Sequence, residues 1–322
     1  MSSRLLNSET IKAEAKRLGF FACGIAKAQK VDSKEEAKLL NWIAQGYNAG
    51  MTYMAKNTAV RLDPRLLLNG AKTIVSVALN YCPKKTIPAE EPQIAYYAYG
   101  LDYHDVVRKK LYSLAGNLGL HTDDKTTTPG QQPFRVLVDT APILERYWAQ
   151  QAGIGWQGKN QQLIIPHAGS MFFLGELILS DEADNYDLPM QDRCGTCTAC
   201  LDSCPTKALG DGTMMNAAKC LSYITIENRS DTITSQEAKA MGNTFYGCDR
   251  CQKACPWNKF ATPTDIQEFQ PKPELIDMTW DKWEVLTEEQ YRQLFKGSAA
   301  KRAKYAGLVR NINAIKTVWK KK

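Results

Sequence analysis

Long apolar stretches are missing from the sequence: no run reaches the eighteen or so residues that a membrane-spanning helix requires. Residues 1–6 also lack the extended apolar core and the cleavage site of a secretion signal. We therefore expect a monomeric, cytoplasmic protein without a membrane partner. The length of 322 residues allows two domains, or one large domain with a small module.

Acidic residues are absent from residues 291–322, which carry ten lysines and arginines. The whole chain has a formal net charge of +7, so the remainder of the chain is net negative. Such a basic end attracts a polyanion, for example a nucleic acid. A solvated basic helix with a frayed tail explains the same charge equally well, and charge alone does not decide between the two.

Cysteines available for disulfides are few, although the chain has ten cysteines. Four of them stand in a run in which the first three are three positions apart, the fourth follows after four positions, and Pro205 comes next. That spacing is typical of bacterial ferredoxins, in which it holds a cubane iron–sulfur cluster. A second run ends in Cys255 and Pro256 but has Phe245 in place of its first cysteine. Cys220, which lies between the runs, can replace it.

The fourth cysteine of a ferredoxin run ligates the other cluster when two clusters are present. The eight cysteines then form two sets of four: Cys194, Cys197, Cys200 with Cys255, and Cys204, Cys220, Cys248 with Cys251. Paired zinc sites are the alternative, because zinc also binds Cys-x-x-Cys, but four closely spaced cysteines ending twice in Cys-Pro are not a zinc pattern. Only Cys23 and Cys82 remain, which fits a reducing compartment.

The order of elements predicts a mixed domain of α/β or α+β class ahead of the cysteine runs. Residues 73–80 and 134–138 are apolar and rich in β-branched side chains, which favours buried strands. Helices are expected over residues 102–118 and 142–151. We expect three segments, namely a catalytic domain, a two-cluster ferredoxin-like module, and a linker with a basic helical C-terminus, over residues 1–185, 186–262 and 263–322.

Gly153, Gly155 and Gly158 match the dinucleotide-binding pattern G-x-G-x-x-G. That fingerprint must follow a strand and begin a helix, whereas these glycines follow a helical pattern and precede a strand pattern. With Lys159 they also approach a P-loop, but Asn160 stands where serine or threonine is required. Nucleotide binding is therefore not expected, and a loop whose backbone approaches a bulky ligand is the better interpretation.

Two clusters form a path for single electrons, so the 185 residues before them should hold a second redox centre or a reducible substrate. Asp139 is the candidate acid, because it lies where a buried strand gives way to a loop. Helix capping before Pro142 is the structural alternative. Cys82 ends the other buried strand, where it either packs in the core or lies beside a metal cofactor.

Several motifs along nearly the whole chain occur together in one known family. They are the two cysteine runs and residues 50–54, 61–64, 138–142, 155–160, 169–170, 173–176 and 220–227. With them the chain resembles the epoxyqueuosine reductases, cobalamin-dependent iron–sulfur enzymes of the last step of queuosine tRNA modification. The resemblance implies a nitroreductase-like domain that holds cobalamin, with two 4Fe-4S clusters as electron path.

The resemblance also implies roles for individual residues. Asp139, held protonated by a partly apolar site, would donate a proton to the departing epoxide oxygen. A histidine ligand to cobalt is not expected, because Asp102 and His104 begin the Asp-x-His-x-x-Gly signature but Val107 replaces its glycine. The expected cofactor wall consists of Arg61, Cys82, Asp139, Lys159, Asn160, Ser170 and Ser222.

A tRNA substrate gives the basic end of the chain a purpose, because the enzyme must hold phosphates and receive an unstacked base. The expected tRNA contacts are Lys301, Arg302, Lys304 and Arg310. Residues 301–313 resemble the start of the HEAT-like helices of longer family members. An external electron donor is also implied. Two alternatives remain, a small-molecule reductase of the reductive dehalogenase type and a non-catalytic electron-transfer protein.

Overall fold

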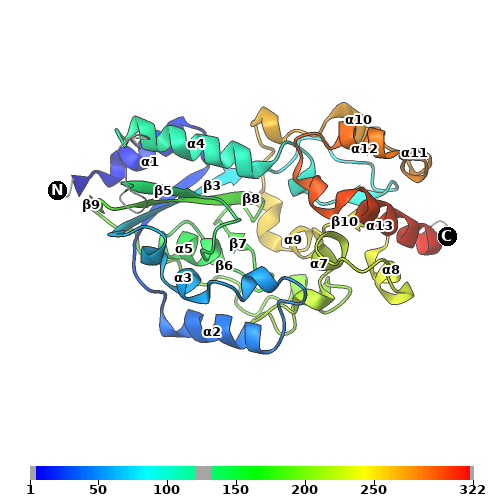
Figure 1. Ribbon diagram of the computed structural model, residues 1–322, viewed down its shortest axis with the longest axis horizontal. Coiled ribbons are helices and arrows are strands. Elements are labelled where there is room, and N and C mark those ends of the chain that lie inside the picture. The colour runs from blue at the N-terminus through cyan, green and yellow to red at the C-terminus, as the bar shows by residue number, and fades with distance from the viewer. Residues whose placement is uncertain (1–4, 121–131, 320–322) are drawn as a thin grey trace.

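A four-stranded antiparallel sheet forms the centre of the first part of the chain in this computed structural model, which describes residues 5–120 and 132–319 (Figure 1). The strand order is β2, β3, β8, β5, with each neighbouring pair antiparallel. The strands are β2 (Ala22–Lys27), β3 (Thr73–Asn80), β8 (Phe172–Leu179) and β5 (Phe134–Leu137). The buried strands predicted at residues 73–80 and 134–138 are thus confirmed.

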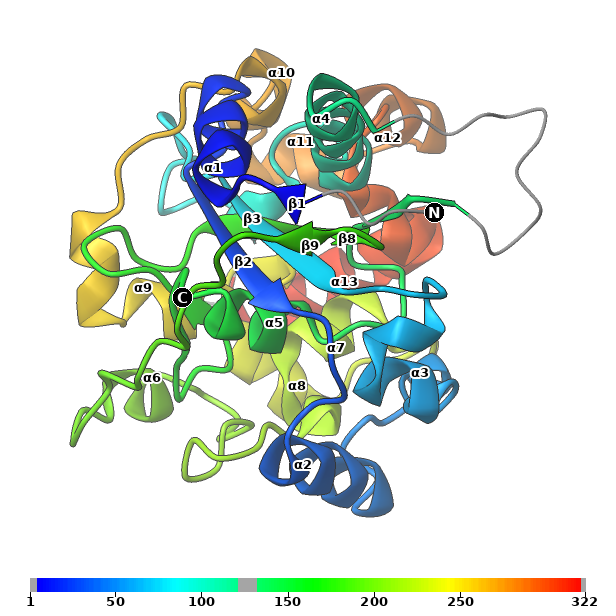
Figure 2. The ribbon, with the colours of Figure 1, turned by 90° about the vertical axis from the view of Figure 1, so that its left-hand side faces the viewer.

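Helices cover both faces of this sheet, so that the domain has three layers (Figure 2). One face carries α1 (Ser8–Arg17) and α4 (Tyr103–Asn117), and the other carries α5 (Glu145–Gln151), with α2 (Ser33–Ala44) and α3 (Thr58–Leu62) beyond it (Figures 1 and 2). Because β3 is buried on both faces, its sequence is an almost continuous apolar run.

The described residues also form three small two-stranded sheets, of which two connect distant parts of the chain and one is a local hairpin. They are β1 (Leu5–Leu6) with β9 (Glu182–Ala183), β6 (Trp156–Gln157) with β7 (Leu163–Ile164), and β4 (Gln93–Ile94) with β10 (Thr244–Tyr246). The pair of β4 and β10 is parallel and joins the first domain to the cysteine-rich segment.

The glycine-rich stretch serves the hairpin of β6 and β7. A Cβ atom on Gly155 would lie 2.3 Å from the carbonyl oxygen of Ile164, and one on Gly158 would lie 2.4 Å from the Ile164 side chain. For these two glycines the close neighbour is the protein's own strand, and the expected approach to a bulky ligand stays a prediction. The prediction that they follow a helix and precede a strand is confirmed.

The cysteine-rich segment and the C-terminus consist mainly of short helices. They are α6 (Ala199–Asp202), α7 (Leu221–Ile226), α8 (Ser235–Met241), α9 (Arg250–Lys253), α10 (Pro273–Ile276), α11 (Trp280–Glu284), α12 (Glu288–Leu294) and α13 (Lys304–Trp319). None of the described helices has the length and apolarity needed to cross a membrane.

The basic C-terminal segment is folded onto the cysteine-rich segment. Helix α13 lies against α8 and β10 (Figure 1), and Leu308, Ile312 and Ile315 on one face of it are buried in a common core with Phe245. This apolar face, rather than charge, fixes the helix in place. The last basic residues of the expected tail, Lys320, Lys321 and Lys322, lie outside the described residues.

Candidate functional site

Asp139 immediately follows β5 and has a strained backbone. Its φ of +53° lies in the left-handed region, which is unfavourable for a residue with a side chain. The chain turns tightly around Asp139. The Thr140 N–H donates a hydrogen bond of 2.6 Å to the Val138 carbonyl and closes this turn. The expected helix start at Pro142 is therefore wrong: residues 138–144 form this turn, and α5 begins only at Glu145.

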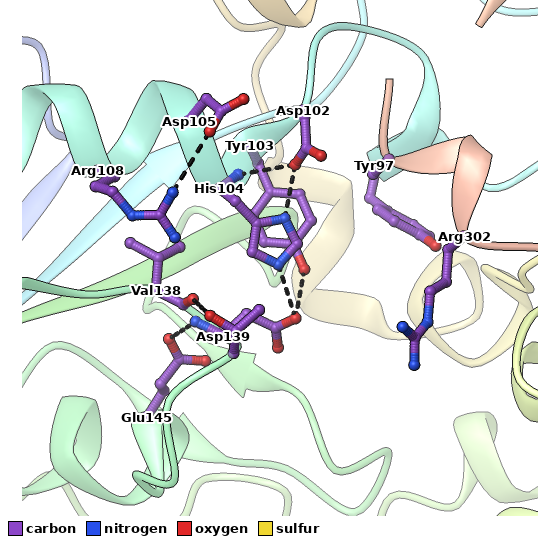
Figure 3. Close-up of polar contacts among 12 residues, drawn as sticks. Tyr97, Asp102, Tyr103, His104, Asp105, Arg108, Val138, Asp139, Glu145 and Arg302 are labelled. Atoms are coloured by element: carbon purple, nitrogen blue, oxygen red, sulfur yellow. Dashed lines mark hydrogen bonds and ion pairs between the residues drawn. The ribbon is translucent and has the colours of Figure 1, made fainter. Parts of the chain in front are cut away.

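The side chain of Asp139 points toward the N-terminal end of α4 (Figure 3). Its Oδ2 accepts a hydrogen bond from the Tyr103 hydroxyl at 2.9 Å and lies 3.1 Å from His104 Nε2. The helix-capping alternative does not hold, since the N-cap of α5 is Leu144. Although 55% of the side chain is exposed, its carboxylate has two specific partners from another element.

His104 lies between two carboxylates. Its Nδ1 is 2.6 Å from Asp102 Oδ1, and its Nε2 faces Asp139. Burial would lower the pKa of His104, but the hydrogen bonds and charges of Asp102 and Asp139 outweigh burial and raise it to about 9. Both ring nitrogens then donate, so His104 is an imidazolium at neutral pH.

The pKa of Asp139 is lowered as a result. Burial works to raise it, but the hydrogen bonds from His104 and Tyr103 and the positive charge of His104 outweigh burial. The expectation that a partly apolar site keeps Asp139 protonated is therefore wrong for this structure. The physical reason is that α4 supplies a cation and a hydroxyl, so the available proton resides on the imidazole.

Arg61 is buried close to this site. Only 8% of it is exposed, its Nε has no hydrogen-bond partner among the described residues, and its guanidinium donates to the Tyr53 carbonyl at 3.3 Å. Burial lowers the pKa of Arg61, while the charges of Asp139 and Glu145 act against that change. A buried cation with a free donor suits an anionic or amide-bearing group, as the cofactor-wall prediction requires.

Arg302 lies on the other side of the same region, and Figure 3 shows Tyr97 beside it. Arg302 forms a two-pronged ion pair with Glu227, with distances of 2.7 and 2.8 Å. About half of its side chain is exposed (54%), so it can meet a further anion.

Two of the residues expected in the cofactor wall lie instead against the cysteine runs. Lys159 Nζ donates to the carbonyls of Gly195 and Cys197 at 2.7 and 3.0 Å. Asn160, which is 2% exposed, donates to the Cys251 carbonyl at 3.4 Å. The structure thus places both side chains with the cysteine loops rather than with Asp139.

The other expected wall residues also have partners near the cysteine-rich segment. Ser170 shares hydrogen bonds with Asn258 and Gln252. The Ser222 backbone N–H faces the Cys220 thiol. Burial raises the pKa of this thiol, and the hydrogen bond from the Ser222 N–H acts in the opposite direction. The carbonyl of Cys82 accepts from the Thr264 N–H at 2.8 Å, and its side chain packs against the core of the sheet, as the core alternative predicts.

The first cysteine set surrounds a cavity. Cys194, Cys197, Cys200 and Cys255 line about 370 Å³, together with Lys159 and aromatic side chains. Trp156 Nε1 donates to Cys194 Sγ at 3.5 Å, which is the kind of contact that stabilises a thiolate. Among the described residues, no group of three or more cysteine, histidine, aspartate or glutamate side chains is arranged to hold a single metal ion.

The second set consists of four partly buried cysteines. Burial raises the pKa of Cys248 to about 11, and the neighbouring Cys220 thiol adds to this effect. Burial also raises the pKa of Cys251, together with the neighbouring thiols of Cys248 and Cys220. Cys204 behaves oppositely: burial would raise its pKa, but hydrogen bonds from Thr206 and from backbone N–H groups lower it. Cys251 also interacts with Cys200 of the first set, so the two sets are adjacent.

The expected tRNA contacts differ in how they are placed. Lys301 and Lys304 are exposed, and Arg302 is partly exposed. Arg310, in contrast, donates to the carbonyls of Asn228 and Ile224 at 2.9 and 3.0 Å and to that of Ser230. The guanidinium of Arg310 is therefore occupied by carbonyl groups at the end of α7, and we no longer expect it to contact tRNA.

Sequence reasoning did not find several residues of this site. Tyr103 and Glu145 received no role, and His104 was considered only as part of an incomplete cobalamin signature. One signal was present, since Asp102 to His104 place an acid, a phenol and an imidazole at a helix start. Their meeting with Asp139 depends on the packing of α4 beside the end of β5.

Two family models match separate parts of the chain. One, described as 4Fe-4S double cluster binding domain, matches residues 193–258. The other, described as Epoxyqueuosine reductase QueG, DUF1730, matches residues 61–140. The first match confirms the expected iron–sulfur module, and it leaves the zinc alternative without support.

Relatives of known name match almost the whole chain. A relative named epoxyqueuosine reductase from Cellulophaga algicola is 40% identical over 316 residues, which cover 98% of this chain and 100% of the relative. A solved epoxyqueuosine reductase with an epoxyqueuosine-modified tRNA-Tyr stem loop is 29% identical, with a TM-score of 0.82, and covers 96% of this chain and 80% of that chain. The Bacillus subtilis enzyme, solved with its catalytic aspartate loop swung out of the active site, matches with 29% identity, a TM-score of 0.84 and the same coverage, 96% and 80%. This chain therefore belongs to the epoxyqueuosine reductase family.

Proposed function

We propose that this chain reduces epoxyqueuosine to queuosine at the wobble position of tRNA anticodons. The observation that carries the proposal is Asp139, on a strained loop and hydrogen-bonded to an imidazolium, in a chain of this family. The solved relatives support it, because one of them holds an epoxyqueuosine-modified stem loop and another has a catalytic aspartate on a mobile loop.

Removing the epoxide oxygen as water requires two electrons and two protons. Cobalamin and two 4Fe-4S clusters, when bound, supply the reducing electrons. The two cysteine sets would hold the clusters, the first around its cavity and the second adjacent to it. Arg61 and Asp139 would face cobalamin, because Arg61 Nε has no hydrogen-bond partner among the described residues and the Asp139 side chain is partly exposed. Lys159, Asn160, Ser170 and Ser222 would instead support the cysteine loops behind it, and Cys82 would pack against the core of the sheet.

One of the two protons comes from the chain's own groups, and solvent water supplies the other. Asp139 accepts a hydrogen bond from the His104 imidazolium, so a proton can pass through the carboxylate to an oxygen that leaves the substrate. Asp102 holds the other ring nitrogen of His104 and favours the charged form of the ring. A raised pKa of His104, about 9, keeps this proton available at neutral pH.

The tRNA would approach across the C-terminal segment. Lys301 and Arg302 lie just before α13 and Lys304 is its first residue; all three are exposed, and they would contact phosphates. We further propose a nitroreductase-like first domain over residues 1–185, a cluster module over 186–262, and a HEAT-like helical end over 263–322. The enzyme would act as a cytoplasmic monomer with an external electron donor.

The decisive experiment is anaerobic incubation of epoxyqueuosine-containing tRNA with the cluster-loaded protein, cobalamin and a strong reductant. Nucleoside mass spectrometry measures conversion to queuosine. Asp139→Asn should lower the rate by about 100-fold or more, as loss of a positioned acid does. Asp105→Asn is the matched control, because Asp105 is an exposed carboxylate of α4 (82%). Equal rates for wild type and Asp139→Asn would remove Asp139 from its role.

Failure of the wild type to convert the tRNA, with bound clusters and cobalamin confirmed, would favour the small-molecule reductase. A protein that binds no corrinoid would favour the electron-transfer protein. The family membership and the polar site around Asp139 argue against both alternatives.

A further inference from the structure

A carboxyl group lies in the interior of the central sheet. Glu176, in the middle of β8, is fully buried (0% exposed) and stands opposite Ser76 of β3 and Leu137 of β5. Neither of its carboxyl oxygens accepts a hydrogen bond from an N–H or hydroxyl group of the described residues. An ionised carboxylate in such a place is costly, so Glu176 keeps its proton.

The side chain of Glu145, at the start of α5, can accept the proton of Glu176. The two side chains are close enough to interact, so a proton on Glu176 can be shared with Glu145. Burial, and after it the charge of Glu145, raises the pKa of Glu176 well above its usual range. Burial and the charge of Asp139 raise the pKa of Glu145 to about 7.

Glu145 also accepts a hydrogen bond from the catalytic loop. Its Oε1 lies 2.6 Å from the backbone nitrogen of Asp139. Figure 3 marks this contact with a dashed line. That N–H belongs to the residue with a φ of +53°, so the bond stabilises a backbone conformation that is unfavourable by itself. The buried pair is thus connected to the strained turn by one short hydrogen bond.

Charged and titratable groups face the pair from several elements. Arg61 of α3, Tyr103 of α4, Asp139 of the loop and Arg146 of α5 all interact electrostatically with Glu145. The two arginines favour a negative Glu145, whereas Asp139 disfavours it. Together, these neighbouring groups favour a single negative charge on the pair of Glu145 and Glu176.

We propose that Glu145 and Glu176 are positioning residues of the reaction: protonated Glu176 donates to Glu145, and Glu145 holds the Asp139 N–H so that the Asp139 carboxylate stays beside His104 and Tyr103. The inference rests on the proposed function for its catalytic consequence. The Bacillus subtilis relative, whose catalytic aspartate loop has been solved swung out, shows that such a loop has a second position in that protein. In this chain the carboxyl pair favours the inward position.

The chemistry of the pair predicts which substitutions are tolerated. Glu145→Gln keeps a carbonyl oxygen as acceptor, whereas Glu145→Ala removes the acceptor. Glu176→Gln keeps a donor in the form of an amide, whereas Glu176→Leu removes the donor and leaves an apolar side chain of suitable size. The conservative variants should therefore rescue the function that the others lose.

Hydrogen exchange of the cluster-loaded full chain, measured by mass spectrometry on peptides covering residues 138–144, tests the proposal. Glu145→Ala should speed exchange of the Asp139 amide by about tenfold or more, as expected for loss of a hydrogen bond to a charged group. Glu176→Leu should act in the same direction, and both glutamine variants should stay within about threefold of wild type. Glu182→Gln, on the exposed strand β9, is the matched control.

Turnover gives the second readout. Glu145→Ala should lower kcat by about tenfold while KM for tRNA stays within about twofold, because tRNA contacts are not touched. Unchanged exchange of the loop in both Glu145→Ala and Glu176→Leu overturns the proposal. If Glu145→Ala fails to fold, Glu176→Leu alone decides. If the wild type does not convert epoxyqueuosine, the proposed function fails, but the exchange result still decides whether the pair holds the loop.

Discussion

The charge of His104 provides a quantitative prediction, which the substitution His104→Gln tests. Glutamine can still donate a hydrogen bond toward Asp139, but it carries no charge and does not titrate. The free energy of unfolding should therefore lose a pH-dependent contribution that only the imidazolium provides. The chain has only three histidines, so few other groups titrate in the same pH range.

The size of the contribution follows from the pKa of His104, which is raised from 6.5 to about 9 in the folded protein. A raised pKa means that the folded state binds the proton more tightly than the unfolded state. The resulting stabilisation is complete below pH 6.5 and disappears as the pH rises through 9. Each pKa unit corresponds to about 1.4 kcal/mol, so the upper limit is about 3 kcal/mol. Because 21% of the side chain is exposed, we expect about 1–3 kcal/mol after screening by solvent.

Urea unfolding of the cluster-loaded protein under anaerobic conditions, at pH 6 and pH 9.5, measures this difference. The stability gap between wild type and His104→Gln should shrink by about 1–3 kcal/mol between the two pH values. His167→Gln is the control, since His167 packs against the rings of Trp257 and Phe260. A gap of the same size at both pH values would refute the assignment of an imidazolium between Asp102 and Asp139.

Three further predictions concern other parts of the molecule. Cys220→Ala should halve the iron bound per chain, measured by iron analysis after anaerobic reconstitution, whereas Cys82→Ala should leave it unchanged. Arg310→Gln should lower the free energy of unfolding by about 1–3 kcal/mol in urea unfolding, because carbonyls at the end of α7 lose their donors. Lys301→Gln should leave stability unchanged, but should weaken tRNA binding and reduce its salt dependence in filter-binding titrations.

Each of these predictions has a clear contrary result. Full iron content in Cys220→Ala would mean that another residue completes the second set. An Arg310→Gln protein of wild-type stability with weaker tRNA binding would return Arg310 to the tRNA contacts. Equal salt dependence for wild type and Lys301→Gln would place the tRNA elsewhere on the surface.

The sequence by itself determined the iron–sulfur module and the buried strands. Cysteine spacing is a local property, because the run must fold around one cluster, so the residues between the ligands carry the signal. The strand β3 was equally readable, since burial on both faces makes all but its last residue apolar or small. Asp139 was found for a similar reason: the strand before it and the helix pattern after it are local.

Tertiary structure decided what depends on neighbours from distant parts of the chain. The protonation of Asp139 depends on His104, which lies 35 residues away in sequence on another element. Lys159 and Arg310 carry the right charge for a ligand, but the fold presents backbone carbonyls to them first. Glu145 and Glu176 meet only because α5 packs under β8. Electrostatic effects act through space at short range, so a sequence can name the charged groups, and only the folded chain determines which of them lie together.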